Sequence, residues 1–188
     1  MTQQQTKTEE EFGVVTAICR DLFIKKLKDY GASWRMMRPC SLTDQIYIKV
    51  HRIRTIEQSG VNLVGEGIYN EFVGIVNYGI ISLIQLYLGE AESIDIDAET
   101  AVALYDKFLG ETVQLMLRKN HDYGEAWRMM RVSSYTDIIL QKVFRTKQIE
   151  DNAGKTLVSE GVDANYMDMV NYSLFALIKL TESAQAQE

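Results

Sequence analysis

Three carboxylates are spaced to share one face of a predicted helix in the segment EGVDANYMDMVNY. At about 100° per residue, Glu160, Asp163 and Asp168 project to the same side. Asp168 lies among apolar residues, where a carboxylate is costly unless it is paired or binds a metal. Because carboxylate oxygens suit Mg²⁺, which in turn holds substrate phosphates, we predict these three residues as a catalytic and metal-binding set. The alternative is a solvated polar face at a helix N-terminus, where acids favour the helix dipole.

Two pairs of cations are spaced to lie together on helices. Lys49 and Arg52 are three residues apart, as are Lys142 and Arg145, so each pair occupies one helix face. An Arg fork binds phosphate oxygens through two hydrogen bonds, and Lys acts as a point charge. We predict that these four residues bind nucleotide phosphates, with further cations upstream at Arg35, Arg38, Arg128 and Arg131. The alternative is ion pairing with neighbouring acidic helices.

The element DYGxxW occurs twice, ending at Trp34 and at Trp127. An aromatic ring beside a glycine turn can stack on a base, and the aspartate can bind a base edge or a ribose hydroxyl. The predicted nucleotide-binding residues of the second element and its surroundings are therefore Asp122, Tyr123, Trp127, Arg128, Arg131 and Asn171. A Trp that follows a helix end is more often a core anchor, and we favour that role for both tryptophans.

These elements lie in an internal duplication. Residues 29–57 align without gaps to residues 122–150, and after one inserted residue LVGEG aligns with LVSEG and VNY with VNY. The apolar positions of each copy recur at helical intervals. They predict three helices in each copy, running roughly over Glu11–Lys28, Ser41–Gly60 and from Leu63, and over Ala98–Asn120, Ser134–Gly154 and from Leu157.

We predict an all-α fold in which the tandem three-helix units pack as a pseudo-two-fold helical bundle, because short helices cannot bury their apolar faces alone. Copy one spans 1–90, an acidic linker 91–99 and copy two 100–188, and both copies form one structural domain. The most apolar helix positions should be nearly fully buried: Ile75, Val76, Ile80, Leu83, Val170, Leu174 and Leu177. A homodimer is an open alternative for the whole chain.

The acidic face is not repeated in copy one. Tyr69 stands where copy two has Asp163, and Gly74 stands where it has Asp168, which leaves Glu66 and Glu71. The cation pairs, in contrast, are present in both copies. We therefore predict an asymmetric metal site that belongs to copy two.

Composition limits the classes of partner. The chain has 188 residues, 46% of them hydrophobic, and a net charge of -6, which offers no electrostatic footprint for direct nucleic-acid binding but allows free nucleotides. Its N-terminal segment MTQQQTKTEEEF is too polar for a signal peptide, so we expect a cytoplasmic protein. The uncharged stretch from Phe72 to Leu88 is just short of a membrane span, and we expect a buried helix and no membrane.

The combined motifs resemble a known family. K-x-x-D-Y-G-x-x-W (from Lys26 and from Lys119), followed by S-x-x-D-x-x-x-x-K-x-x-R and E-G…N-Y, is similar to the nucleotide modification associated domain family over both copies. More distantly, the chain resembles MazG-like proteins of the all-α nucleoside triphosphate pyrophosphohydrolase superfamily. That resemblance implies Mg²⁺ held by helix carboxylates, with E-x-x-E on one helix and E-x-x-D on the next. Here Glu160 and Asp163 supply E-x-x-D once, and cations replace E-x-x-E.

The resemblance implies a nucleotide-binding MazG-like protein. Its activity would be that of a Mg²⁺-dependent (deoxy)nucleoside triphosphate pyrophosphohydrolase linked to nucleotide modification or to control of the nucleotide pool. The alternative is a catalytically inactive helical module for binding or assembly. The missing E-x-x-E favours the module, whereas the repeated cations and the acidic face favour the enzyme.

Overall fold

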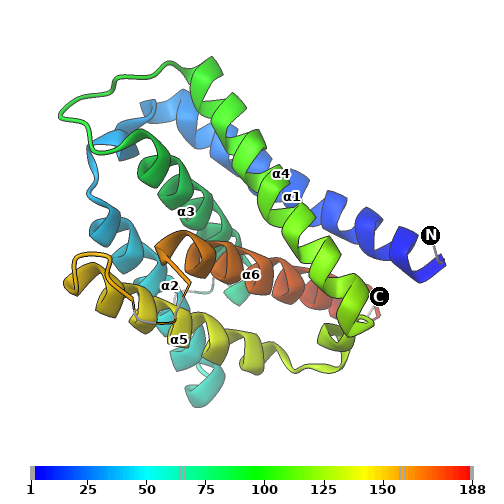
Figure 1. Ribbon diagram of the computed structural model, residues 1–188. Helices are drawn as coiled ribbons and strands as arrows, with labels where there is room; N and C mark the ends of the chain where they lie inside the picture. Colours follow the sequence, from blue (N-terminus) through cyan, green and yellow to red (C-terminus); the bar gives the residue numbers. More distant parts are fainter. Residues whose placement is uncertain (1–2, 64, 66, 157, 159, 187–188) are drawn as a thin grey trace.

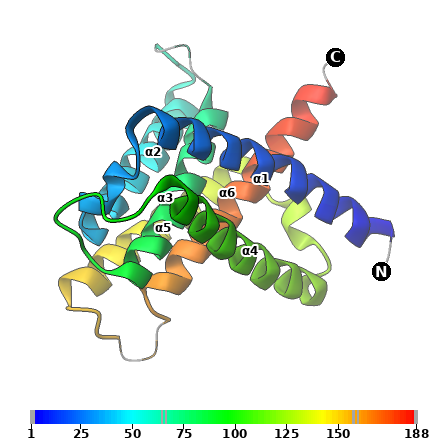
Figure 2. The same cartoon turned by 90° about the horizontal axis from the view of Figure 1, so that it is seen from above.

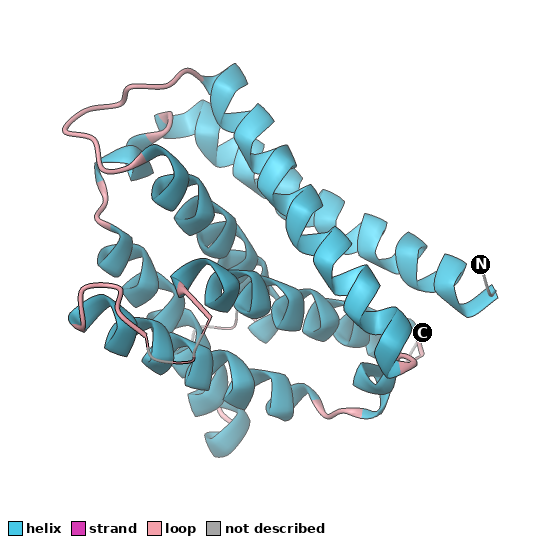
Figure 3. Ribbon diagram, viewed as in Figure 1, coloured by secondary structure: helices cyan, strands magenta, loops and turns pink. Residues whose placement is uncertain are grey.

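The computed structural model describes residues 3–63, 65, 67–156, 158 and 160–186 (Figure 1). Six α-helices follow one another in that part of the chain: α1 (Gln3–Tyr30), α2 (Pro39–Ser59), α3 (Ile68–Leu88), α4 (Ala98–Tyr123), α5 (Val132–Asp151) and α6 (Val162–Gln185). Two short 3₁₀ helices, η1 (Ser33–Met36) and η2 (Ala126–Met129), follow α1 and α4. Figure 3 shows helices joined by loops, and no strand occurs among the described residues. The all-α prediction is confirmed, whereas the MazG-like likeness stays a prediction.

Helix ends follow the local chemistry of the chain. Asp97 caps α4 by accepting a hydrogen bond from the backbone N–H of Thr100 at 2.8 Å. The second helix of each copy begins two residues earlier than the sequence predicts, and Pro39 suits the first turn of α2 because its missing N–H has no helical partner there. The third helices begin later than predicted, at Ile68 and Val162. Leu157 lies outside the described residues.

Four helices form the central bundle. α3 and α6 pack against each other, and each packs against the second helix of its own copy, α2 or α5, which also contact one another. α1 and α4 run in opposite directions across one side of this bundle, where each contacts both α3 and α6 (Figure 2). The third helices are therefore covered on most sides.

Reciprocal contacts relate the two copies by a pseudo-two-fold axis. Thr43 donates to Glu150 at 2.7 Å, and the aligned pair repeats the contact in the other direction, with Thr136 donating to Glu57 at 3.0 Å. Two ion pairs are exchanged in the same way, Lys147–Asp44 at 2.5 Å and Arg54–Asp137 at 3.6 Å. Such self-complementary pairing is the signature of two-fold packing. The repeat boundaries at residues 90 and 100 stay predictions.

The apolar third helices supply the middle of the core. The seven positions predicted to be buried are all at most 3% exposed: Ile75, Val76, Ile80, Leu83, Val170, Leu174 and Leu177. α3 is long and apolar enough to cross a membrane, but 72% of its most apolar window is buried against other helices, which fits a core helix. The cytoplasmic location stays a prediction.

The closest approach of α3 to α6 depends on Gly79. A Cβ atom there would lie 2.5 Å from Val170 Cγ2, and a valine side chain is stiff about χ1. We expect Gly79→Ala to lower the free energy of unfolding by about 1–3 kcal/mol through overpacking. Gly110→Ala is the matched control on α4, because nothing lies within 4 Å of its added Cβ. It should stabilise the protein by about 0.5–1 kcal/mol. Denaturant unfolding of both variants decides, and equal effects would contradict this packing.

Glu150 is a half-buried carboxylate at the pseudo-two-fold contact. Burial raises its pKa, and the hydrogen bonds that it accepts from Thr43 and from Tyr166 offset part of the rise. Burial likewise raises the pKa of the matching Glu57, against the lowering effect of the Thr136 hydroxyl. The folded protein therefore holds these protons more tightly than the unfolded chain, and ionisation costs stability.

Glu150→Gln should raise the melting temperature near pH 7, because it removes a charge whose burial costs stability. The gain should be complete above the raised pKa of the folded state. It should fade as the pH falls from that raised value to the unfolded value of about 4.3, and it should be absent below 4.3, where the carboxyl group of Glu150 is protonated in both the folded and the unfolded protein. Thermal unfolding followed by circular dichroism from acidic to neutral pH measures the difference, with the exposed Glu92→Gln as the control. A gain that does not change with pH would contradict the burial of this charge.

Candidate functional site

The two 3₁₀ turns are braced in the same way from the third helices. Gln85 on α3 donates to the carbonyl oxygens of Arg35 at 2.9 Å and Met37 at 2.7 Å. Lys179, the aligned residue of α6, donates to the carbonyl oxygens of Arg128, at 2.9 Å, and Met130. A glycine in the left-handed region precedes each turn, at Gly31 and Gly124, and ends the preceding helix. Both copies thereby fix the DYGxxW element against the third helix.

The tryptophans of these elements belong to the core, as the sequence favours. Trp34 is 6% exposed and Trp127 is 5% exposed. Their indole nitrogens Nε1 are buried and have no hydrogen-bond partner within the described part of the chain. An unpaired buried donor is unfavourable. Each ring is thus a packing anchor that also carries one unused donor.

Three of the four predicted phosphate-binding cations are held by a carboxylate. In copy one, Glu71 contacts Arg52 and lies 3.4 Å from Lys49. In copy two, Asp168 contacts Lys142 at 2.6 Å, and Lys119 completes the group at 3.4 Å.

Arg145 differs from its counterpart Arg52. Among the described residues it forms no ion pair, because Asn165 stands where copy one has Glu71. Lys26, the counterpart of Lys119, likewise has no described ion pair, because Gly74 stands where copy two has Asp168. The third helix of each copy thus carries a carboxylate that binds these cations, and Asp168 of copy two lies about one helical turn further along the helix than Glu71 of copy one. Each copy therefore leaves a different cation without a carboxylate.

A cavity of about 340 Å³ opens beside α3 in copy one, and we call it the copy-one pocket. Residues of the repeated motifs form much of its wall: Lys26, Tyr30, Trp34, Gly74, Asn77 and Tyr78. The absence of a side chain at Gly74 lets the aliphatic part of Lys49 lie across the helix, where an added Cβ would come within 2.5 Å of Lys49 Cε. The Lys49 ammonium lies 5.9 Å from the centre of the Tyr78 ring. The pocket is thus apolar and aromatic inside, with a cation at its edge.

In copy two, larger side chains stand at two of the positions that line the copy-one pocket. Asp168 replaces Gly74, and Phe175 replaces Ile81. The Phe175 ring stacks on Trp127 with centroids 4.5 Å apart, and Phe12 meets it edge-on at 5.7 Å. Copy two therefore has a larger side chain than copy one at both of these positions.

A second cavity, of about 570 Å³, lies beside the C-terminal half of α5, and we call it the copy-two basic pocket. Lys142, Arg145 and Lys155 line it, together with the side chains of Gln148 and Asn152. No acidic residue lines it among those described. Phe144, which is 51% exposed, adds an aromatic surface.

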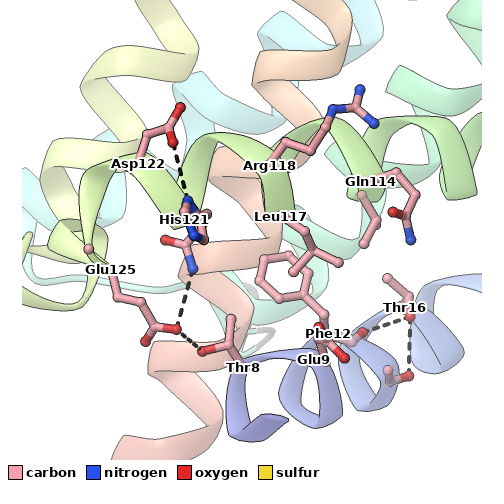
Figure 4. A pocket seen from close by; sticks show the side chains of 14 residues that line it. Thr8, Glu9, Phe12, Thr16, Gln114, Leu117, Arg118, His121, Asp122 and Glu125 are labelled. Carbon is pink, nitrogen blue, oxygen red and sulfur yellow. Dashed lines mark hydrogen bonds and ion pairs between the residues drawn. The ribbon is translucent and has the colours of Figure 1, made fainter. Parts of the chain in front are cut away.

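A further hollow, of about 1060 Å³, is a groove between α1 and α4, and it is chemically less suited to phosphate (Figure 4). Glu9, Asp122 and Glu125 contribute to its lining, against Arg118 and His121. The carboxylate of Glu125 is already engaged there, because it accepts a hydrogen bond from Thr8 at 2.5 Å and pairs with Arg128 at 2.6 Å.

The predicted nucleotide-binding residues of copy two do not gather around one cavity. Asp122 lines the α1/α4 groove, Tyr123 is 74% exposed and Arg131 is exposed. Asn171 is buried and donates to the carbonyl oxygen of Thr112 at 3.2 Å.

Arg128 is engaged on all sides. Its guanidinium lies between three carboxylates, those of Glu11 at 2.5 Å, Glu125 at 2.6 Å and Glu182 at 3.3 Å. Its Cζ atom also lies 4.3 Å from the centre of the Trp127 ring. Arg128 therefore ties α1, η2 and the end of α6 together.

The three predicted metal ligands also differ in exposure and in their contacts. Glu160 precedes α6 and is exposed, Asp163 is exposed in the first turn, and Asp168 is held by two lysines. In the described ranges no group of three His, Cys, Asp or Glu side chains is placed to hold a metal ion. Glu66, the copy-one counterpart of Glu160, lies outside those ranges. The geometry does not fit a Mg²⁺ centre here, and the metal assignment stays a prediction.

Sequence reasoning gave no binding role to Lys26, Tyr78 or Lys155. The replacement of Asp168 by Gly74 in copy one was visible in the alignment of the copies, but it was interpreted as a lost metal ligand. Its structural effect is the room that it leaves beside Trp34. Aligning the two copies for side-chain volume as well as for charge would have found the copy-one pocket.

Asp168→Asn should lower the free energy of unfolding by about 1–3 kcal/mol, because Lys142 would be left partly buried without a counter-ion. The matched control is Asp21→Asn, which breaks the exposed pair with Lys25 on α1 and should cost about 0.5 kcal/mol or less. Denaturant unfolding of both variants measures the difference. A cost for Asp168→Asn no larger than that of the control would contradict the role given to this pair.

Comparison with known proteins agrees with the duplication. The family model described as nucleotide modification associated domain 1 matches the chain twice, over residues 26–86 and 119–180. No curated protein and no solved structure matches. The matched segments begin at the two lysines of the K-x-x-D-Y-G-x-x-W motif and together cover more than half of the sequence. The chain therefore belongs to the nucleotide modification associated domain 1 family and carries two tandem copies of its domain.

Proposed function

We propose that the protein binds a nucleotide in the copy-one pocket, with the base and sugar inside and the phosphates at the edge. One observation carries this proposal. The motif residues common to both copies line this cavity, and it is open in copy one, where position 74 has no side chain. Its volume of about 340 Å³ is within the range of small-molecule sites.

The chemistry of the lining suits a nucleotide. Tyr30, Trp34 and Tyr78 line the cavity and offer aromatic surface for a base. Lys26 has no carboxylate partner among the described residues and supplies charge for phosphate oxygens. Membership of a family associated with nucleotide modification favours this class of ligand over other aromatic molecules.

Hydrolysis is the finer proposal that the MazG-like resemblance carries. Glu71 and Asp168 are already engaged by cations, and the exposed residues Glu160 and Asp163 do not line the copy-one pocket. The residues present therefore support binding better than they support a metal-dependent cleavage. The family membership is equally compatible with a binding protein that serves a separate modifying enzyme.

Gly74→Asp should abolish the binding of nucleoside monophosphates in the copy-one pocket and leave the helix content unchanged, because it reproduces the arrangement of copy two, where Asp168 lies between lysines. Lys26→Gln should weaken binding about tenfold through the loss of a charge-assisted contact. Lys119→Gln is the matched control in copy two and should leave affinity unchanged.

Calorimetric titration with ribo- and deoxynucleoside mono-, di- and triphosphates, each with and without Mg²⁺, makes the measurement. Retention of monophosphate affinity in Gly74→Asp, or an equal loss in Lys26→Gln and Lys119→Gln, would contradict the copy-one pocket. Absence of binding by any nucleotide to the parent would favour an assembly module instead. Release of pyrophosphate from a triphosphate would support the finer proposal of hydrolysis.

A further inference from the structure

We propose that copy two carries a second, separate site, in the copy-two basic pocket, for a polyphosphate anion of the pyrophosphate or nucleoside polyphosphate type. This site goes beyond the nucleotide pocket of copy one and is built from other residues. The proposal depends on a difference between the copies: copy one has the carboxylate of Glu71 beside Arg52, and copy two has the neutral Asn165 at the aligned position.

The first step is the unpaired guanidinium of Arg145. Its counterpart Arg52 contacts Glu71, whose side chain is 11% exposed. The aligned residue in copy two is Asn165, which is buried and donates to the carbonyl oxygen of Gly161 at 2.7 Å. A neutral amide cannot neutralise a guanidinium. Arg145 therefore keeps its full charge, and no described carboxylate pairs with it.

The second step is the charge of the surrounding wall. Lys155 and Lys142 line the same cavity as Arg145, and no acidic residue does so among those described, in a chain whose net charge is -6. Lys142 shares its charge with Asp168 at 2.6 Å, whereas Lys155 has no described ion pair. A concave surface with two uncompensated cations concentrates a positive potential, which selects a multiply charged anion.

The third step is preorganisation of the donors. Asn152 donates to the carbonyl oxygen of Lys155 at 3.0 Å and so fixes the turn that follows α5. Ala153 and Gly154 in that turn both have positive φ angles, of 52° and 79°. A non-glycine residue in this region is uncommon and reflects a constrained backbone. These contacts fix the backbone at Lys155, and Lys155 and Arg145 line the same cavity.

The fourth step concerns the source of the anion. Phe144 lies next to Arg145 on α5, is 51% exposed and lines the cavity. An exposed aromatic ring beside a phosphate-binding group can stack on a base, which a pyrophosphate ion lacks. The contribution of Phe144 to binding therefore distinguishes a nucleotide from an inorganic polyphosphate.

The test is calorimetric titration of the full chain with inorganic pyrophosphate and with a nucleoside triphosphate at low ionic strength. Both titrations use the Gly74→Asp background, in which the copy-one pocket is filled, so failure of the nucleotide proposal does not affect the result. Pyrophosphate should bind, and rising salt should weaken it. Arg145→Gln and Lys155→Gln should each reduce affinity at least about tenfold. The control Arg118→Gln removes an exposed cation of α4 that does not line this pocket, and it should leave affinity unchanged.

Asn165→Glu gives an independent check, because it restores the carboxylate arrangement of copy one and should abolish anion binding without removing any cation. If this buried substitution prevents folding, the two surface variants still decide. If Phe144→Ala loses affinity for the triphosphate but not for pyrophosphate, the site belongs to nucleotides. If the ratio of the two affinities does not change, the site belongs to inorganic polyphosphate. Absence of pyrophosphate binding in the Gly74→Asp protein, or equal affinity in the parent, Arg145→Gln and Lys155→Gln proteins, would overturn the proposal.

Discussion

A carboxylate that is largely removed from water must lie against cations, and this constraint shapes both halves of the protein. In copy one, Glu71 meets this constraint by pairing with the two cations of α2, Lys49 and Arg52. In copy two, Asp168 meets it by pairing with both Lys142 and Lys119. The two carboxylates lie one helical turn apart in the aligned copies. That displacement decides which cation is neutralised in each copy, and it leaves position 74, in the wall of the copy-one pocket, without a side chain.

The scaffold around these pairs is symmetric, which is why so small a displacement matters. The Thr–Glu contacts across the pseudo-two-fold axis are repeated in both directions, as is the bracing of each 3₁₀ turn by the aligned residues Gln85 and Lys179. The backbone that presents the cations is thus the same in both copies. Differences in what each copy can bind must come from individual side chains rather than from a rearranged fold.

The parts of this structure that depend on regular patterns could be predicted from the sequence. Helical spacing and the gap-free alignment predicted the all-α fold, and the uncharged run of α3 predicted the burial of Ile80 and its neighbours. The site could not be predicted to the same degree, because its contacts join residues far apart in the chain. Asp168 was correctly singled out as a carboxylate that needs a partner. The partner is a pair of lysines on α4 and α5, and no spacing within α6 could indicate it.

The duplication itself makes the asymmetry attainable. In a symmetric dimer of single-copy chains, every substitution occurs twice, so opening the aromatic pocket by a glycine at position 74 would remove the corresponding carboxylate from both halves. Fusion of the copies lets Gly74 and Asp168 coexist. A single copy also could not easily have both the aromatic pocket of copy one and the basic pocket of copy two. Without a carboxylate at either position, its clustered cations would face one another uncompensated, at a cost in stability that grows as they leave water. Dividing an aromatic opening and a cationic opening between two fused copies avoids that cost, because each copy retains one carboxylate to hold its remaining cations.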